Sequence, residues 1–126
     1  LVEGAGGVLV PLNERGQTWG DFLKATKMPV LVAARNELGV LNHTLLTVEY
    51  LQSIGAEVLG VCLQNPINGA NMDSSQRTNF EVLRDYLSKL PVFSIPFLVE
   101  NAGKTGVIKQ GQKKIKKTLA EILELV

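Results

Sequence analysis

The sequence has a single cysteine, and it has no hydrophobic run of the length that a membrane helix needs, about 20 residues. Cys62 cannot form an internal disulfide, and it lies within the apolar run Val58–Leu63, so we expect a buried thiol in a reducing compartment. No signal-peptide pattern precedes the first strand-like segment. These absences predict a cytoplasmic protein with no membrane partner.

An excess of charge of one sign is also missing, because 13 lysine and arginine residues face 12 acidic ones, for a net charge of +1. Such a chain has no long-range attraction for nucleic acid or for an anionic membrane. Lysines do cluster between residues 109 and 117, where they interleave with apolar residues such as Ile115. That pattern is typical of the solvated face of an amphipathic helix, so we expect no nucleic-acid partner.

A third absence is a complete P-loop, G-x-x-x-x-G-K-[ST]. Gly103-Lys104-Thr105 matches only the end of this motif, because the first glycine would have to stand at position 98, which is Leu98. The segment Gly106–Gly111 is also a poor start for the helix that must follow. His43 is interpreted as an ordinary first-turn helix residue, and we assign no catalytic residue to this chain.

What is present is an alternation of strand-like and helical patterns, which predicts an α/β fold with a mostly parallel sheet and crossover helices. The extended runs are Val8–Leu12, Pro29–Ala34, Glu57–Leu63 and Pro91–Leu98, the last limited by Pro96. Helices are expected from Thr18 as N-cap to Lys27, from Asn42 or Thr44 to Ile54, over Ser75–Leu90 and over Gln110–Val126. The polar loops are Gln64–Ser74 and Asn101–Gly106.

The length of 126 residues fits one domain, but two features suggest a portion of a longer one. Leu1–Gly4 has the pattern of a strand end that runs into a glycine loop, where a domain rarely begins. Pro29–Ala34 is rich in β-branched residues, which predicts burial on both faces. Three main strands would leave an open parallel edge, so we expect further strands from elsewhere, and we interpret residues 1–126 as the C-terminal part of a single domain.

Ligands of open α/β sheets bind beyond the carboxyl ends of the strands. Four segments are expected there: Glu3–Gly7, Arg35–Asn42, Gln64–Pro66 and Pro96–Asn101. The carboxylate of Glu3 can hold Mg²⁺, and the glycines after it let backbone approach a phosphate, although they are equally compatible with a simple tight turn. Residues 35–42 lead into a helix N-terminus, which attracts a carboxylate or phosphate. We expect these segments to meet in one cleft.

Several blocks of the sequence resemble the dethiobiotin synthetase family. Val2–Leu12 is similar to its VEGAGG-x-x-x-PL segment, and residues 29–47 are similar to its PVILV…LG-x-[IL]-NH-x-LLT block. Gly60-Val61 with Gln64-Asn65, then Ile95-Pro96 and Glu100-Asn101, follow in the same order and spacing. The resemblance covers nearly the whole chain and implies a homodimeric, P-loop NTPase-like fold.

The resemblance implies an ATP- and Mg²⁺-dependent cyclo-ligase of biotin biosynthesis. CO₂ forms a carbamate on one amine of 7,8-diaminopelargonate, ATP phosphorylates the carbamate, and the second amine displaces phosphate to close a ureido ring. Mg²⁺ and cationic side chains neutralise charge on the transferring phosphoryl group. The P-loop, the catalytic lysine and a second Mg²⁺-binding aspartate would lie in an N-terminal half before Leu1, so the resemblance also implies that this chain alone is incomplete.

By position, the resemblance assigns roles to individual residues. Glu3 would bind Mg²⁺, and Val40, Leu41 and Asn42 would present the helix N-terminus to the substrate carboxylate across the dimer interface. The residues that would contact ATP are Glu3, Gly4, Ala5, Gly6, Gln64, Asn65, Pro96, Phe97, Leu98 and Asn101. The adenine-reading asparagine of the family aligns with Gln64, and Asn65 lies one place later, so either residue can contact adenine.

Two other readings stay open. Related domains also occur as non-catalytic regulatory or dimerisation modules of other enzymes, such as some phosphate acetyltransferases. The cobyrinic acid amidating ligases are a third possibility, but their glutaminase domain needs a nucleophilic cysteine, and Cys62 within a predicted strand fits that role poorly.

Overall fold

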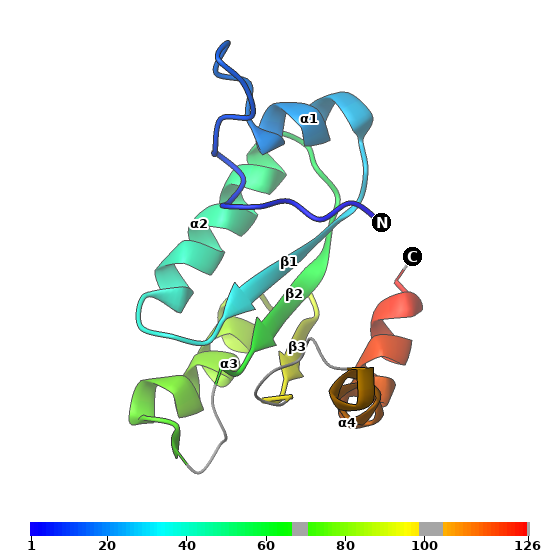
Figure 1. Ribbon diagram of the computed structural model, residues 1–126. Coiled ribbons are helices and arrows are strands. Elements are labelled where there is room, and N and C mark those ends of the chain that lie inside the picture. The colour runs from blue at the N-terminus through cyan, green and yellow to red at the C-terminus, as the bar shows by residue number, and fades with distance from the viewer. Residues whose placement is uncertain (67–70, 99–104, 126) are drawn as a thin grey trace.

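The computed structural model describes residues 1–66, 71–98 and 105–125 (Figure 1). Its elements follow one another in the order α1 (Trp19–Thr26), β1 (Val30–Arg35), α2 (Val40–Ser53), β2 (Val58–Gln64), α3 (Ser74–Tyr86), β3 (Val92–Ile95) and α4 (Thr105–Leu123). β1, β2 and β3 form a parallel sheet in that order, so each strand lies beside the next one along the chain. The α/β prediction with crossover helices is confirmed.

The core lies on one face of the sheet, where α2 packs on β1 and β2, and α3 packs on α2 and β3. The most deeply buried apolar side chains come from β2, α2 and α3: Val48, Leu51, Val61, Leu63 and Leu83. Cys62 in the central strand is also buried, and this burial raises the pKa of its thiol. Figure 1 shows α4 on the β3 side of the sheet, away from α2.

Burial of the first long strand on both faces, as predicted for Pro29–Ala34, is wrong for this structure. β1 hydrogen-bonds to β2, and α2 covers only the face that carries Val32, which is 8% exposed. On the opposite face Leu31 is 37% exposed and Ala33 is exposed as well. The β-branched run therefore reflects an apolar strand with one uncovered face.

Two helices begin earlier than predicted. α2 begins at Val40 instead of Asn42 or Thr44, because Gly39 takes the left-handed backbone conformation (φ 91°) that turns the chain into the helix. α4 begins at Thr105 instead of Gln110, so the segment Gly106–Gly111, predicted to be a poor start for a helix, lies inside its first turns. A helical glycine costs about 1 kcal/mol, which the packing of an amphipathic face can outweigh.

The other helix and strand ends agree more closely with the sequence. Thr18 is the N-cap of α1 as predicted, in a capping box with Asp21. α3 ends at Tyr86, earlier than the predicted Leu90, although Leu90 still packs against the core. β3 ends at Ile95, immediately before the proline that was expected to limit it.

The segment before α1 is less regular than predicted. Val8–Leu12 is not an extended strand, because the Val10 N–H bonds to the Gly7 carbonyl (3.1 Å) in a turn and Pro11 forms only an isolated bridge with Thr18. Leu1–Gly4 does not form the expected strand end either. A strand needs a hydrogen-bonded neighbour, and within the described ranges the sheet contains only β1, β2 and β3.

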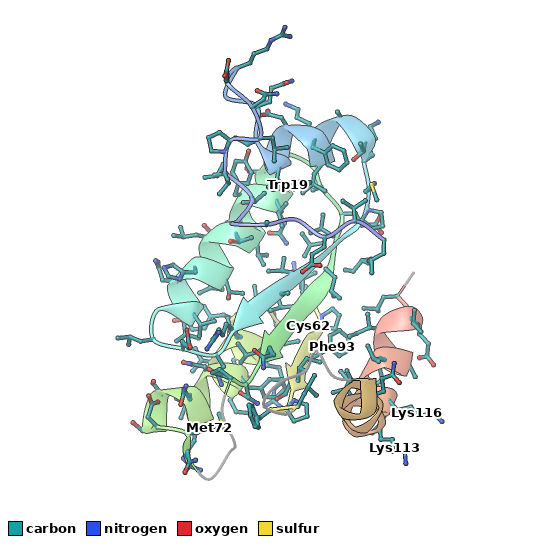
Figure 2. The ribbon with its side chains drawn as sticks, in the orientation of Figure 1. Trp19, Cys62, Met72, Phe93, Lys113 and Lys116 are labelled. Carbon is teal, nitrogen blue, oxygen red and sulfur yellow. The ribbon has the colours of Figure 1, made fainter. Side chains whose placement is uncertain are left out.

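α4 is amphipathic in the way its lysines predicted. Ile115 is half-buried, whereas Lys113 and Lys116 are exposed and point away from the rest of the molecule (Figure 2). Lys117 forms an ion pair one turn along the helix with Glu121 (3.7 Å). Across the described ranges, no helix combines the length and the apolar character that a bilayer span requires.

Substituting alanine at Gly60 in β2 is expected to lower the free energy of unfolding by about 1–3 kcal/mol. A Cβ added there would lie 2.7 Å from the Pro91 carbonyl oxygen, which is rigid backbone at the entrance to β3. Gly111 in α4 is the matched control, because its added Cβ would meet Leu98 at 3.7 Å, and alanine there should stabilise by about 0.5–1 kcal/mol. Urea unfolding gives the free energy of unfolding of both variants. Equal changes for Gly60→Ala and Gly111→Ala would contradict the prediction.

The N-cap of α3 should make stability depend on pH. Hydrogen bonds from the Gln76 N–H and the Ser75 hydroxyl lower the pKa of Asp73 below its ordinary value of 3.8. A lowered carboxyl pKa stabilises the fold above 3.8, and this contribution is lost as pH falls through the folded-state pKa. Asp73→Asn should therefore unfold at a lower temperature than the unmodified protein at neutral pH, and this difference in unfolding temperature should close as pH falls through the folded-state pKa of Asp73. Calorimetry across this pH range measures both unfolding temperatures. A difference between them that did not change with pH would contradict the prediction.

Candidate functional site

A buried network of amide side chains joins the carboxyl ends of β1 and β2. Asn36, the residue after β1, is 1% exposed, and its Nδ2 donates to Asn65 Oδ1 (2.7 Å) and to the Gln76 carbonyl (2.8 Å). Its Oδ1 accepts from Asn79 Nδ2 (2.8 Å), and its carbonyl accepts from Gln76 Nε2 (2.9 Å). Because both amide hydrogens and the amide oxygen are bonded, the Asn36 side chain is fixed in one orientation.

The turn after β2 is held on both sides by backbone hydrogen bonds. The Asn36 N–H donates to the Gln64 carbonyl (2.8 Å), and the Asn65 N–H donates to the Ile95 carbonyl (2.8 Å). Gln64 Nε2 donates to the Asn65 carbonyl (2.6 Å), and Asn65 Nδ2 lies 3.5 Å from Ser94 Oγ. Gln64 and Asn65 therefore lie between the ends of β1 and β3, both half-buried.

The residues after β3 lie at the same edge of the sheet, since Asn65 is bonded to the last residue of that strand. Pro96 is exposed, and Phe97 and Leu98 are half-buried. These three apolar residues follow Ile95 directly, and the Leu98 side chain lies beside Gly111 of α4. Asn101, the remaining residue expected in this segment, lies outside the described residues.

The N-terminus of α2 follows β1 at the same carboxyl edge. Val40 is buried, Leu41 is half-buried and Asn42 is exposed, and together they form the first turn of the helix. The Val40 N–H donates to the Glu37 carbonyl (3.1 Å), but no side chain caps this helix. Helix geometry leaves the N–H groups of Leu41 and Asn42 without an intrahelical acceptor, which suits an anionic group.

The glycine loop packs against α1. Trp19 Nε1 donates to the Ala5 carbonyl (3.1 Å), and a Cβ added at Gly4 would lie 3.5 Å from the Trp19 ring. Figure 2 shows Trp19 on α1, beside this loop. Gly6 has a positive φ of 85°, a conformation that favours glycine. Glu3 is exposed.

The structure brings three of the four predicted segments to one edge and leaves the fourth apart. Figure 1 shows residues 1–7 in the half of the molecule that contains α1, well away from the arrowheads of β1 and β2. The bond from Trp19 Nε1 to the Ala5 carbonyl holds the loop that follows Glu3 against α1, and not at the carboxyl edge of the sheet. The physical reason is that Leu1–Gly4 pairs with no described strand, so the loop is placed by Trp19 instead of by the sheet.

A family model described as "AAA domain" matches residues 1–94. The chain belongs to this family. Among its relatives, the ATP-dependent dethiobiotin synthetase BioD of Bacillus velezensis is 39% identical over 95 residues, an alignment that covers 75% of this chain and 39% of that protein. The BioD protein of Bacillus subtilis is 36% identical over 110 residues, with coverage of 86% and 45%. That of Legionella pneumophila strain Corby is 57% identical over 52 residues, with coverage of 41% and 24%.

These matches confirm the resemblance to dethiobiotin synthetases and the P-loop NTPase-like fold of this AAA domain. The family match, residues 1–94, begins in the block that carries the glycine loop and continues into β3. The chain spans 39% of the Bacillus velezensis protein and 45% of the Bacillus subtilis protein. Most of the length of those enzymes therefore has no counterpart in the 126 residues.

Sequence reasoning missed the centre of the amide network in this AAA domain. Asn36, Gln76 and Asn79 are all buried, and none was assigned a role, although Asn36 falls within the segment 35–42 that was expected at this edge. One signal was available: Gln76 and Asn79 fall on the same helical stripe as Leu83, where an amide is unusual unless it is hydrogen-bonded. No such signal marked Asn36, whose side-chain partners stand at least 29 residues further along the chain.

A concave surface lies along one side of α4. It is an open, largely apolar groove on α4, lined by Gln112, Lys113, Lys116, Leu119, Ala120 and Leu123. It contains none of the predicted site residues of the AAA domain.

Proposed function

We propose that this chain is the C-terminal part of a single-domain, ATP-dependent dethiobiotin synthetase of biotin biosynthesis. The enzyme closes a ureido ring on 7,8-diaminopelargonate with CO₂ by way of a phosphorylated carbamate. The observation that carries the proposal is the carboxyl edge of the sheet, where a fixed turn at Gln64 and Asn65 lies beside apolar residues and an uncapped helix N-terminus. Relatives named as ATP-dependent dethiobiotin synthetases support the same activity.

Nucleotide binding is supported by the chemistry of this edge. An amide from Gln64 or Asn65 can bond the polar edge of adenine, while Pro96, Phe97 and Leu98 offer an apolar wall for its ring. We include Asn101 in the nucleotide site on the basis of the resemblance alone. Gly4, Ala5 and Gly6 contribute backbone that can approach a phosphate closely.

Substrate binding is supported by the first turn of α2. The N–H groups of Leu41 and Asn42 lack intrahelical acceptors, and the helix dipole adds partial positive charge, so together with Val40 they suit the carboxylate of 7,8-diaminopelargonate. In a homodimer the turn would serve the partner's site. No titratable side chain of this turn is needed for that role.

The residue that would hold Mg²⁺ is Glu3. Mg²⁺ prefers one or two carboxylates together with phosphate oxygens and water, so an exposed carboxylate beside bare backbone fits it. In the described part of the chain, no cluster of three or more histidine, cysteine or acidic side chains could form a complete metal site by itself. When bound, Mg²⁺ would supply charge neutralisation on the transferring phosphoryl group.

We further propose that a P-loop-bearing N-terminal half adds strands along the edge of β1 that no described strand occupies, opposite β2, and also covers the face of β1 that is exposed. Leu31 and Ala33 are exposed there, on a strand that has β2 as its described neighbour. Strands added at this side would also give Leu1–Gly4 a hydrogen-bonded neighbour and could carry Glu3 to the carboxyl edge. Cytoplasmic location, favoured by the lone cysteine, belongs to the same proposal.

The proposal is tested by assaying the complete protein for conversion of 7,8-diaminopelargonate and bicarbonate to dethiobiotin by mass spectrometry. Product should require ATP and Mg²⁺, and the 126-residue chain alone should form none, because it supplies no phosphate cradle. Adding the separately expressed N-terminal half to the chain should restore turnover. A folded complete protein that binds ATP but forms no dethiobiotin would favour the non-catalytic module instead.

A further inference from the structure

We infer that Asn36 is a positioning residue for base selection: it fixes the turn at Gln64 and Asn65 so that the site prefers ATP to nucleotides with other bases. The inference rests on the proposed function, since it concerns how the nucleotide site of that enzyme is built. Asn36 itself is buried and is not proposed to contact the nucleotide. It acts through the two residues of the turn.

The hydrogen-bonding groups of Asn65 are occupied by other protein groups. Its Oδ1 accepts from Asn36 Nδ2 (2.7 Å), its N–H donates to the Ile95 carbonyl (2.8 Å), and its Nδ2 lies 3.5 Å from Ser94 Oγ. An amide bound on these sides holds the turn and is poorly placed to turn toward a base. Gln64 is therefore the residue that reads the base.

Asn65 orients the Gln64 amide. Gln64 Nε2 donates to the Asn65 carbonyl (2.6 Å), which leaves Oε1 as the acceptor of that amide. Adenine carries an amino donor at the position where guanine carries a carbonyl acceptor. An Oε1 held toward the base accepts from adenine and faces an acceptor in guanine, so the amide orientation decides the selectivity.

The Asn36 side chain is held in one position, so its bond to Asn65 is maintained. Its side chain is 1% exposed and bridges three segments, with Gln76 and Asn79 of α3 holding it from the side opposite Asn65. Its backbone N–H also bonds the Gln64 carbonyl (2.8 Å). Loss of the bond to Asn65 should therefore loosen the Gln64 amide while the bond from Asn79 of α3 to the residue at position 36 persists.

The test is Asn36→Asp in the complete protein, because aspartate keeps the acceptor for Asn79 and loses both donors. Competition of ATP and GTP against a fluorescent ATP analogue gives the affinity ratio, and ring closure gives the ratio of kcat/KM. Both ratios should fall about tenfold, the value of one hydrogen bond in discrimination. Asn36→Ser is the second variant if aspartate prevents folding, and it should give a fall in the same direction.

Two controls separate positioning from general destabilisation. Leu83→Ala removes a fully buried side chain outside the turn and should weaken the fold while leaving the ATP-to-GTP ratio unchanged. Asn65→Ala should lower the ratio, and combining it with Asn36→Asp should add no further loss, because both changes break the same bond.

Each outcome decides a different claim. A folded Asn36→Asp variant with the normal ratio, or a double variant with additive losses, overturns the positioning role and leaves ring closure untouched. If the unmodified protein binds ATP selectively but closes no ring, the proposed function fails. The ATP-to-GTP affinity ratio of the Asn36→Asp variant still tests the positioning role in that case. Failure of the unmodified protein to bind either nucleotide overturns both claims.

Discussion

Glu3→Gln in the complete protein is expected to lower kcat for ATP-dependent ring closure by about 100-fold. Glutamine keeps the size of the side chain and loses its charge, so it cannot balance a divalent cation that must neutralise the transferring phosphoryl group. The exposed side chain makes no contribution to the core, so the fold should be unaffected. The fall should therefore appear in turnover and not in stability.

The Mg²⁺ dependence distinguishes this explanation from an indirect effect. Raising the Mg²⁺ concentration should partly restore the rate of the Glu3→Gln variant, which a change in loop shape would not allow. Glu14→Gln is the matched control, because it removes an exposed carboxylate from the neighbouring polar loop. Kinetics of Glu3→Gln equal to those of the control would remove Glu3 from the metal site.

Leu83→Ala is expected to lower the free energy of unfolding by about 2–5 kcal/mol. Leu83 is fully buried and packs with Val40 of α2 and Leu63 of β2, so it joins two helices to the central strand. Truncation removes apolar contact and leaves a cavity that this closely packed junction cannot fill. A loss of that size is a large fraction of the stability of a typical domain.

Urea unfolding followed by circular dichroism measures this effect. Tyr86→Ala, one turn further along α3, is the matched control because Tyr86 is 74% exposed. Its substitution should change the free energy of unfolding by less than about 0.5 kcal/mol. Equal losses for the two variants would mean that α3 does not pack on the sheet as described.

Local patterns predicted much of the fold. The threonine before α1 was recognisable because a hydroxyl that caps a helix acts on residues two or three places away. The end of β3 was recognisable because Pro96 lacks the N–H that a ladder needs. The order of strands and helices follows from hydrophobic periodicity, which is also local. These features depend on neighbours within one turn or one strand.

The candidate site was predictable only in part. Gln64, Pro96 and the first turn of α2 were predicted together because carboxyl ends of parallel strands share one edge of a sheet. The position of the glycine loop was not predictable, because it depends on whether a strand neighbours Leu1–Gly4 and on the contact of Trp19 with Ala5. The exposure of one face of β1 was not predictable either, because the composition of a strand does not determine what packs on it.

By itself, the sequence determined the α/β class, the family resemblance and the edge of the sheet where the chemistry belongs. Only the tertiary structure decided that Asn36 is the centre of that edge. Its side-chain partners lie 29 to 43 residues away along the chain, and an amide becomes fixed only when folding buries it among them. Periodicity reports which way a side chain points, whereas the identity of its distant hydrogen-bond partners is set by the packing of β1, β2 and α3 together.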